Sequence, residues 1–181
     1  GWKISSRKIS ANWTPDTTLT MSDSAHSNNP DLIPLSVSRV VEDANTDTRI
    51  LVLTRTDDQD TFMIWVGAPE GDSIRRALDS TAPPRPMSHD LVKSFGEHFG
   101  ITTKRVVLTD VKSSTYYATV FLENKGVERS IDARPSDAIA LALRTHAPIY
   151  TTQDVWKRRS GQHLDAWLAK LDTKDIDTQE V

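Results

Sequence analysis

The segment Asp132-Ala133-Arg134-Pro135-Ser136-Asp137 holds the densest group of residues suited to phosphate chemistry. The carboxylate of Asp132 could hold a divalent cation such as Mg²⁺ or Mn²⁺, and the Arg134 guanidinium could bind a phosphate through two parallel hydrogen bonds. Asp137 falls in the first turn of a predicted helix, where a carboxylate also stabilises the helix start. The segment therefore predicts either phosphodiester hydrolysis or a purely structural ion pair.

The motif Ser88-His89-Asp90 also has two interpretations. As a functional group, His89 would ligate a metal or move protons, with the Asp90 carboxylate beside it. As a structural group, Ser88 or Asp90 would cap a helix whose first turn is exposed. No other histidine in the sequence completes an HExxH-type pair, so the residues alone favour the cap.

Three basic residues, Arg85, Lys104 and Arg105, are candidate phosphate contacts, although for each one taken alone a solvated surface charge is the favoured interpretation. The chain of 181 residues carries a formal net charge of −3, whereas non-specific nucleic-acid binders usually have a basic surplus. Nucleic-acid binding would therefore depend on local patches. The absence of cysteine excludes disulfides, thiolate metal sites and cysteine nucleophiles.

Alternating runs of strand-forming and helix-forming residues must position these groups. Short β-branched and aromatic runs bounded by polar clusters predict strands, at Leu35–Val41, Ile50–Thr54, Phe62–Val66, Arg105–Leu108, Tyr116–Leu122, Val127–Ile131 and Ile149–Thr151. Periodic apolar residues predict helices, at Pro69–Ser80, from Ser88 or Asp90 to Gly100, and at Pro135–Thr145. We expect Leu91, Val92 and Phe95 to face inward, and the last helix to be deeply buried.

The two halves of this pattern resemble each other at a constant offset. Asp72, Ala77 and Pro83 recur 65 positions later as Asp137, Ala142 and Pro148. This predicts an α+β fold built from a duplicated β-β-β-α unit, about 35–84 and 101–150, with a mainly antiparallel, curved or barrel-like sheet and the helices outside. Because Asp137 has a counterpart and Asp132 and Arg134 do not, the repeat favours the latter two as functional residues.

The domain is predicted at 34–155, after a polar N-terminal tail (1–33) and before a C-terminal segment (156–181). In that last segment, Leu164, Trp167, Leu168 and Leu171 fall on one face of a predicted amphipathic helix. Met21 is a candidate natural start. No stretch approaches the roughly 20 apolar residues of a membrane span, and we expect a cytoplasmic protein without membrane contact.

Several blocks of the chain resemble the bifunctional nuclease (BFN) domain family. They are Arg85–Leu91, Thr115–Ala118, Ile131–Ala142 and Pro148–Tyr150, supported upstream by Ile64–Gly67 and Glu70. The resemblance covers about 35–155, and the Asp-Ala-Arg-Pro-Ser-Asp-Ala block is its most specific part. Ser114 departs from the pattern, because a glycine is common there.

The resemblance implies an α+β fold that is often dimeric and an activity named for cleaving RNA and DNA. We therefore predict a nuclease, assisted by a divalent cation such as Mg²⁺ or Mn²⁺, and a homodimer. His89, Asp132 and Arg134 are the predicted catalytic residues, with Asp132, Asp90 and Asp137 as candidate metal ligands. The alternative is a non-enzymatic binding or regulatory module of the same fold.

Overall fold

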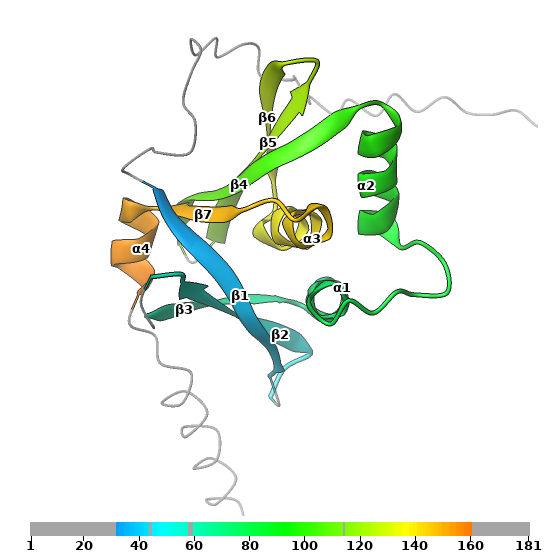
Figure 1. Ribbon diagram of the computed structural model, residues 1–181. Coiled ribbons are helices and arrows are strands. Elements are labelled where there is room, and N and C mark those ends of the chain that lie inside the picture. The colour runs from blue at the N-terminus through cyan, green and yellow to red at the C-terminus, as the bar shows by residue number, and fades with distance from the viewer. Residues whose placement is uncertain (1–31, 44, 58–59, 114, 161–181) are drawn as a thin grey trace, which may run out of the picture.

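The computed structural model describes residues 32–43, 45–57, 60–113 and 115–160 as an α+β fold (Figure 1). Seven strands form one mixed, mostly antiparallel sheet in the order β3-β2-β1-β7-β4-β5-β6. The strands are β1 (Leu32–Glu42), β2 (Thr48–Arg55), β3 (Thr61–Gly67), β4 (Ile101–Lys112), β5 (Thr115–Asn124), β6 (Val127–Ala133) and β7 (Ile149–Thr152). The helices are α1 (Ala68–Leu78), α2 (Ser88–His98), α3 (Pro135–Thr145) and α4 (Gln153–Arg159).

Strand β7 joins two antiparallel three-stranded units, β1–β2–β3 and β4–β5–β6. It pairs antiparallel with β1, where Leu32 faces Thr152, and parallel with β4, where Val106 faces Ile149. The sequence predicted mainly antiparallel pairing, and β4–β7 is the one parallel pair in the described sheet. This pairing is possible because α3 carries the chain back across the sheet before β7 begins.

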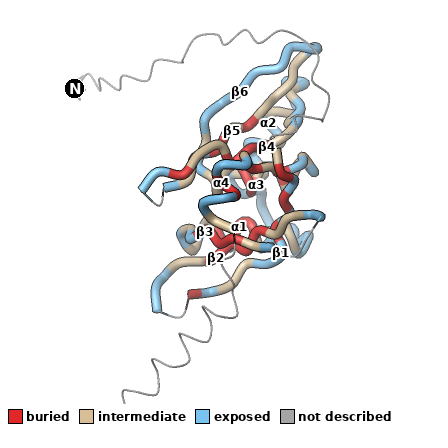
Figure 2. The backbone as a smooth tube through the Cα atoms, turned by 90° about the vertical axis from the view of Figure 1, so that its left-hand side faces the viewer, coloured by how far each residue is buried: buried red, intermediate tan, exposed pale blue. Residues whose placement is uncertain are grey.

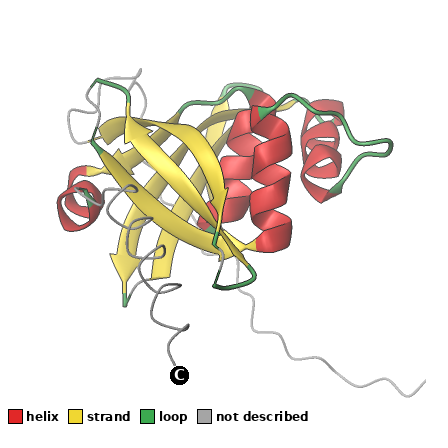
Figure 3. Cartoon of the chain, turned by 90° about the horizontal axis from the view of Figure 1, so that it is seen from below, coloured by secondary structure: helices red, strands yellow, loops and turns green. Residues whose placement is uncertain are grey.

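Helices α1 and α3 lie next to each other against the sheet, with their buried sides in one hydrophobic core (Figure 3). Ile74 of α1 and Ile139 of α3 are completely buried there, together with Phe62 and Leu108 from the sheet. Figure 2 shows that the buried residues lie on helices and strands in the middle of the domain. The predicted burial of α3 is confirmed, because Ala138, Ile139, Ala140 and Ala142 are all buried.

The sheet is open, with β3 and β6 as its edge strands. The predicted duplication and barrel-like curvature stay predictions. Helix α4, which the sequence did not predict, brings Trp156 into the core, edge-on to Phe62 at 5.8 Å between ring centroids. The predicted amphipathic helix around Leu164–Leu171 lies outside the described residues. In the described part of the chain, no helix is long and apolar enough to cross a membrane.

The orientation of α2 differs from the prediction. Leu91, Val92 and Phe95 were expected to face inward, but they are 64%, 55% and 62% exposed, and no residue of α2 is buried. The N-cap is Met87 rather than Ser88 or Asp90, and the Asp90 carboxylate accepts the Met87 N–H at 2.9 Å. The polar side of α2 faces the domain because its side chains find charged partners there.

Candidate functional site

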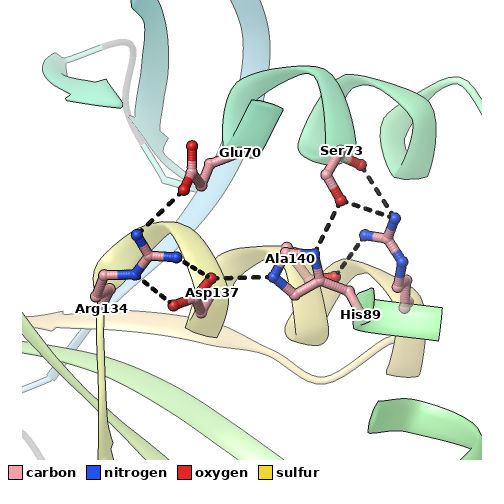
Figure 4. A network of polar contacts seen from close by, with 7 residues as sticks. Glu70, Ser73, His89, Arg134, Asp137 and Ala140 are labelled. Atoms are coloured by element: carbon pink, nitrogen blue, oxygen red, sulfur yellow. Dashed lines mark hydrogen bonds and ion pairs between the residues drawn. The ribbon is translucent and has the colours of Figure 1, made fainter. Parts of the chain in front are cut away.

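The site lies where the first turns of α1 and α3 come together. Each helix begins directly after the third strand of its unit, with Pro69 and Pro135 in the first turn. Proline suits this position, because its fixed φ is helical and it has no N–H to leave unpaired. The two helices pack against each other, so Glu70 of α1 lies opposite Arg134 and Asp137 at the start of α3 (Figure 4).

Arg134 links the two helix starts. Its Nε and one terminal nitrogen donate to both carboxylate oxygens of Asp137, at 2.7 and 3.0 Å, and its other terminal nitrogen donates to Glu70 Oε1 at 3.1 Å. The Arg134 side chain is nevertheless 65% exposed, whereas Glu70 and Asp137 are 23% and 35% exposed. A guanidinium that is fixed in orientation but open to solvent is suited to binding an oxyanion.

His89 lies between Asp137 and Ser73 (Figure 4). Its Nε2 is 3.1 Å from Asp137 Oδ1, and its Nδ1 is 3.0 Å from the hydroxyl oxygen of Ser73. Because a carboxylate can only accept, Nε2 carries the proton and donates to Asp137. In the neutral ring, Nδ1 then accepts the Ser73 hydroxyl proton. The sequence interpretation of His89 as an exposed first-turn residue is therefore wrong.

Arg144 binds Ser73, the partner of His89, and its side chain is only 8% exposed. It donates to Asp90 Oδ1 at 2.6 Å, to the carbonyl oxygen of Ala140 at 3.0 Å, and to the carbonyl and hydroxyl oxygens of Ser73 at 3.2 and 3.0 Å. Since Arg144 donates to the Ser73 hydroxyl oxygen, the hydroxyl proton is free to point at His89. Arg144 thereby fixes the direction of the hydrogen bond between Ser73 and His89.

The positively charged neighbours of Asp90 and Asp137 keep both carboxylates ionised. Burial raises the pKa of Asp137, but hydrogen bonds from Arg134 and His89 outweigh it, and the pKa lies below its ordinary value. The hydrogen bond from Arg144 lowers the pKa of Asp90, against a smaller opposing effect of burial. Asp137 and Glu70 in turn raise the pKa of Arg134. At neutral pH, Asp137 is therefore a carboxylate between two donors.

The structure brings together part of the predicted site and leaves the rest outside. His89, Arg134 and Asp137 are connected, and Asp90 is reached through Arg144 and Ser73. Asp132 is not part of the group. It is exposed on β6, and because its neighbour Ala133 pairs with the fully buried Ala118, Asp132 points to the opposite face of the sheet.

The three predicted phosphate contacts also lie outside the site. Arg105 pairs with both carboxylate oxygens of Glu128 at 2.7 and 2.8 Å and lies over the Phe121 ring, on the sheet face opposite the buried Val106. Lys104 forms an ion pair with Glu123 at 3.2 Å. Arg85 is exposed in the connector before α2. Strand alternation is the reason that Arg105 cannot reach helices on the other face.

The three predicted metal ligands do not meet. Asp90 is paired with Arg144, Asp137 is paired with Arg134 and His89, and Asp132 points away from both. Among the residues that the structure describes, no group of three or more His, Asp or Glu side chains is placed to hold a metal ion. Glu70 and Asp137 are instead the two carboxylates that share a partner, Arg134.

The sequence interpretation missed Glu70, Ser73 and Arg144 as members of the site. Their spacing in the sequence could have indicated them. Glu70 and Ser73 are three residues apart on α1, and Asp137 and Arg144 are seven residues apart on α3. Both spacings place polar residues on one face of a helix. The repeat misled the interpretation of Asp137, since its counterpart Asp72 pairs with Arg49 and Arg75 in a different ion-pair group.

Comparison of the sequence with known proteins shows which family and which proteins the chain resembles. The family model described as "Bifunctional nuclease domain" matches residues 51–163, which include every member of the site. Uncharacterized protein Rv1829 of Mycobacterium tuberculosis (strain H37Rv) is 32% identical over 106 residues, 59% of this chain and 63% of that protein. Bifunctional nuclease 1 of Oryza sativa subsp. japonica is 28% identical over 109 residues, 58% of this chain and 33% of that protein.

Proposed function

Because the chain belongs to the bifunctional nuclease domain family, we propose that it is a nuclease that hydrolyses phosphodiester bonds in RNA and DNA. The observation that carries the proposal is Arg134, an exposed guanidinium held in place by Asp137 and Glu70. The starts of α1 and α3 add the positive ends of two helix dipoles beside it, which favour a bound phosphate.

In the proposed reaction, a phosphate oxygen of the substrate replaces one or both carboxylates as the partner of Arg134. Arg134 then stabilises the negative charge that develops on the phosphoryl oxygens. Asp137, released from Arg134 but still bonded to His89, becomes a stronger base. Water attacks phosphorus, its proton passes to the free oxygen of Asp137, the ester P–O bond breaks, and the leaving oxygen takes a proton from solvent.

We further propose that Glu70 and Oδ1 of Asp137, the oxygen bonded to His89, hold a divalent cation such as Mg²⁺ or Mn²⁺ when substrate is bound, so that Oδ2 of Asp137 stays free to take the proton. Carboxylate oxygens are the ligands such cations take, and Mg²⁺ is often held by only two of them together with waters and substrate phosphate. A bound cation would polarise the phosphoryl oxygen. Mn²⁺ should broaden the nuclear magnetic resonance signals of the backbone amides around residues 70 and 137, and the double variant Glu70→Gln, Asp137→Asn should abolish this broadening.

The test is cleavage of single-stranded RNA and single-stranded DNA with Mg²⁺ or Mn²⁺. Arg134→Ala should lower the rate by roughly 100-fold or more, the usual effect of removing one charge-stabilising group. Asp132→Ala is the matched control, because Asp132 lies two residues away but on the other face of the sheet. Equal rates in wild type and Arg134→Ala, or equal losses in both variants, would refute the proposed site.

A second candidate function is a binding or regulatory module without turnover. It is favoured by the internal pairing of the site, since both ring nitrogens of His89 and both carboxylates beside Arg134 already have partners. The net charge of −3 also opposes strong non-specific binding of nucleic acid. Saturable oligonucleotide binding that requires Arg134, with no cleavage under any metal condition, would favour this function over the nuclease.

A further inference from the structure

An open pocket of about 390 Å³ lies between the last turns of α1 and α3, the first half of α2 and the connector 79–87. Figure 1 shows this connector on the side of the helices away from the sheet. The volume is within the range of roughly 300–1,000 Å³ that is typical of small-molecule sites. Arg134 precedes α3, whereas the pocket lies at the far end of this 11-residue helix, about 16 Å away.

Arg76 brings a positive charge to the pocket that no carboxylate balances. Its terminal nitrogen Nη1 lies 3.7 Å from the Met87 sulfur, which is a weak acceptor, and Arg76 has no ion pair in the part of the chain that the structure describes. Asp90 also lines the pocket, but its oxygens already accept hydrogen bonds from Arg144 and from the Met87 N–H. The pocket is therefore suited to an anion.

Three hydroxyl groups near Arg76 favour a phosphate over a smaller anion. Ser80, Thr81 and Ser94 all line the pocket, and a hydroxyl can donate to an anionic oxygen. A guanidinium binds two oxygens of a phosphate in parallel. The terminal oxygens of a phosphate monoester can therefore take donors from Arg76 and from the hydroxyls together, whereas a carboxylate has only two oxygens to offer.

The other walls of the pocket suit a flat ring. His146 lines the pocket and is exposed where α3 ends, and imidazole rings stack on nucleobases. Pro83, Pro86 and Leu143 supply apolar surface. Because the proline rings fix the backbone φ, this part of the connector is stiff, and a ligand does not have to order it on binding.

We infer that this pocket binds a nucleoside monophosphate, either free or as the phosphorylated end of a nucleic-acid strand. The phosphate binds Arg76 and the pocket hydroxyls, and the base lies against His146 and the two prolines. This site is distinct from the one proposed for phosphodiester cleavage. The inference does not depend on that activity, because binding is measured without cleavage.

The pocket is also connected to His89. Asp90 and Arg144 line the pocket and bind each other. Arg144 also binds Ser73, the hydroxyl partner of His89. Since no residue of α2 is buried, a ligand that contacts α1, α2 and α3 together would restrain α2 in the position in which His89 meets Asp137.

A nuclear magnetic resonance titration of the full chain with adenosine monophosphate tests the pocket. We expect saturable shifts of the backbone amides of residues 80–82 and 94. Adenosine alone and inorganic phosphate alone should each bind at least about 10-fold more weakly, because each lacks half of the contacts. Arg76→Gln should weaken binding of adenosine monophosphate by about 10-fold or more, since it removes charge-assisted hydrogen bonds.

Arg75→Gln is the matched control. Arg75 is adjacent to Arg76 and partly exposed, but it pairs with Asp72 and Glu42 and does not line the pocket. Its variant should bind adenosine monophosphate as the wild type does, and so should Arg134→Ala.

A single-stranded oligonucleotide with a terminal phosphate distinguishes the two sources of the ligand. If it binds through Arg76 at least as tightly as adenosine monophosphate, the ligand is a strand end, and if it binds more weakly, the ligand is the free nucleotide. Equal binding of adenosine and adenosine monophosphate, an unchanged affinity in Arg76→Gln, or shifts around residues 70 and 137 that disappear in Arg134→Ala would overturn the inference. A chain that cleaves nothing but still binds adenosine monophosphate through Arg76 would refute the nuclease alone.

Discussion

The ring nitrogen Nε2 of His89 lies 3.1 Å from Oδ1 of Asp137, although 48 residues separate them along the chain. This hydrogen bond joins α2 to the first turn of α3, and Arg134 binds the same carboxylate from the solvent side. Asp137 is therefore the centre of the site, with an internal donor on one side and an exposed donor on the other.

Removal of the His89 ring should loosen α2. His89→Ala deletes the hydrogen bonds to Asp137 and Ser73, and at about 1 kcal/mol each we expect the free energy of unfolding to fall by about 2 kcal/mol. Urea denaturation measures this change. His98→Ala on the same helix is the control, because His98 is exposed, and it should change the free energy by less than about 0.5 kcal/mol. Equal effects would contradict the role of His89.

Replacement of Arg134 by lysine should separate the effect of its positive charge from the effect of its paired hydrogen bonds to Asp137. Lysine keeps the positive charge but cannot donate to both oxygens of Asp137 in parallel. We expect Arg134→Lys to weaken phosphate binding and to raise the pKa of Asp137 toward its ordinary value. A carboxyl titration by nuclear magnetic resonance measures the pKa, and Arg129→Lys on the exposed strand β6 is the control. An unchanged Asp137 pKa in Arg134→Lys would show that the ion pair is not formed in solution.

The hydrogen bonds that Arg134 and His89 donate to Asp137 should make the free energy of unfolding depend on pH. Its pKa is lower in the folded protein than the ordinary value of 3.8, so the folded state binds its proton less tightly than the unfolded chain. The resulting stabilisation is complete above about pH 5 and is lost as the pH falls through the folded pKa. Asp137→Asn should thus be less stable than wild type at pH 7, and the difference should shrink below pH 4. A constant difference across denaturation curves at several pH values would contradict this linkage.

The buried Arg144 should matter more for stability than the exposed arginines. Arg144→Met leaves Asp90 and the carbonyl of Ser73 without this donor, and we expect a loss of about 2 kcal/mol in the free energy of unfolding. The control is Arg158→Met, because Arg158 is 43% exposed and also pairs with aspartates. Its loss should stay below about 1 kcal/mol. Chemical denaturation that ranks the two variants in the reverse order would contradict the structure.

Local patterns in the sequence determined the elements and the chemical types of the site. Helix α3 begins at Pro135 and ends at Thr145, as predicted, because proline, periodic apolar residues and the strand before it are all local signals. The seven predicted strands all lie within observed strands for the same reason. The sequence likewise identified His89, Arg134 and Asp137 as candidates, because their residue types and spacing are independent of how the helices pack.

Only the tertiary structure decided which candidates meet. Strand alternation and pairing turned Asp132 and Arg105 away from the helices, and the packing of α1 on α3 brought Glu70 and Ser73 to Arg134 and His89. The orientation of α2 was decided the same way. Its apolar stripe predicted an inward face, but ion pairs and hydrogen bonds to residues distant in sequence fixed its polar side against the domain. Periodicity shows that a helix has two faces, and only the long-range contacts determine which face is buried.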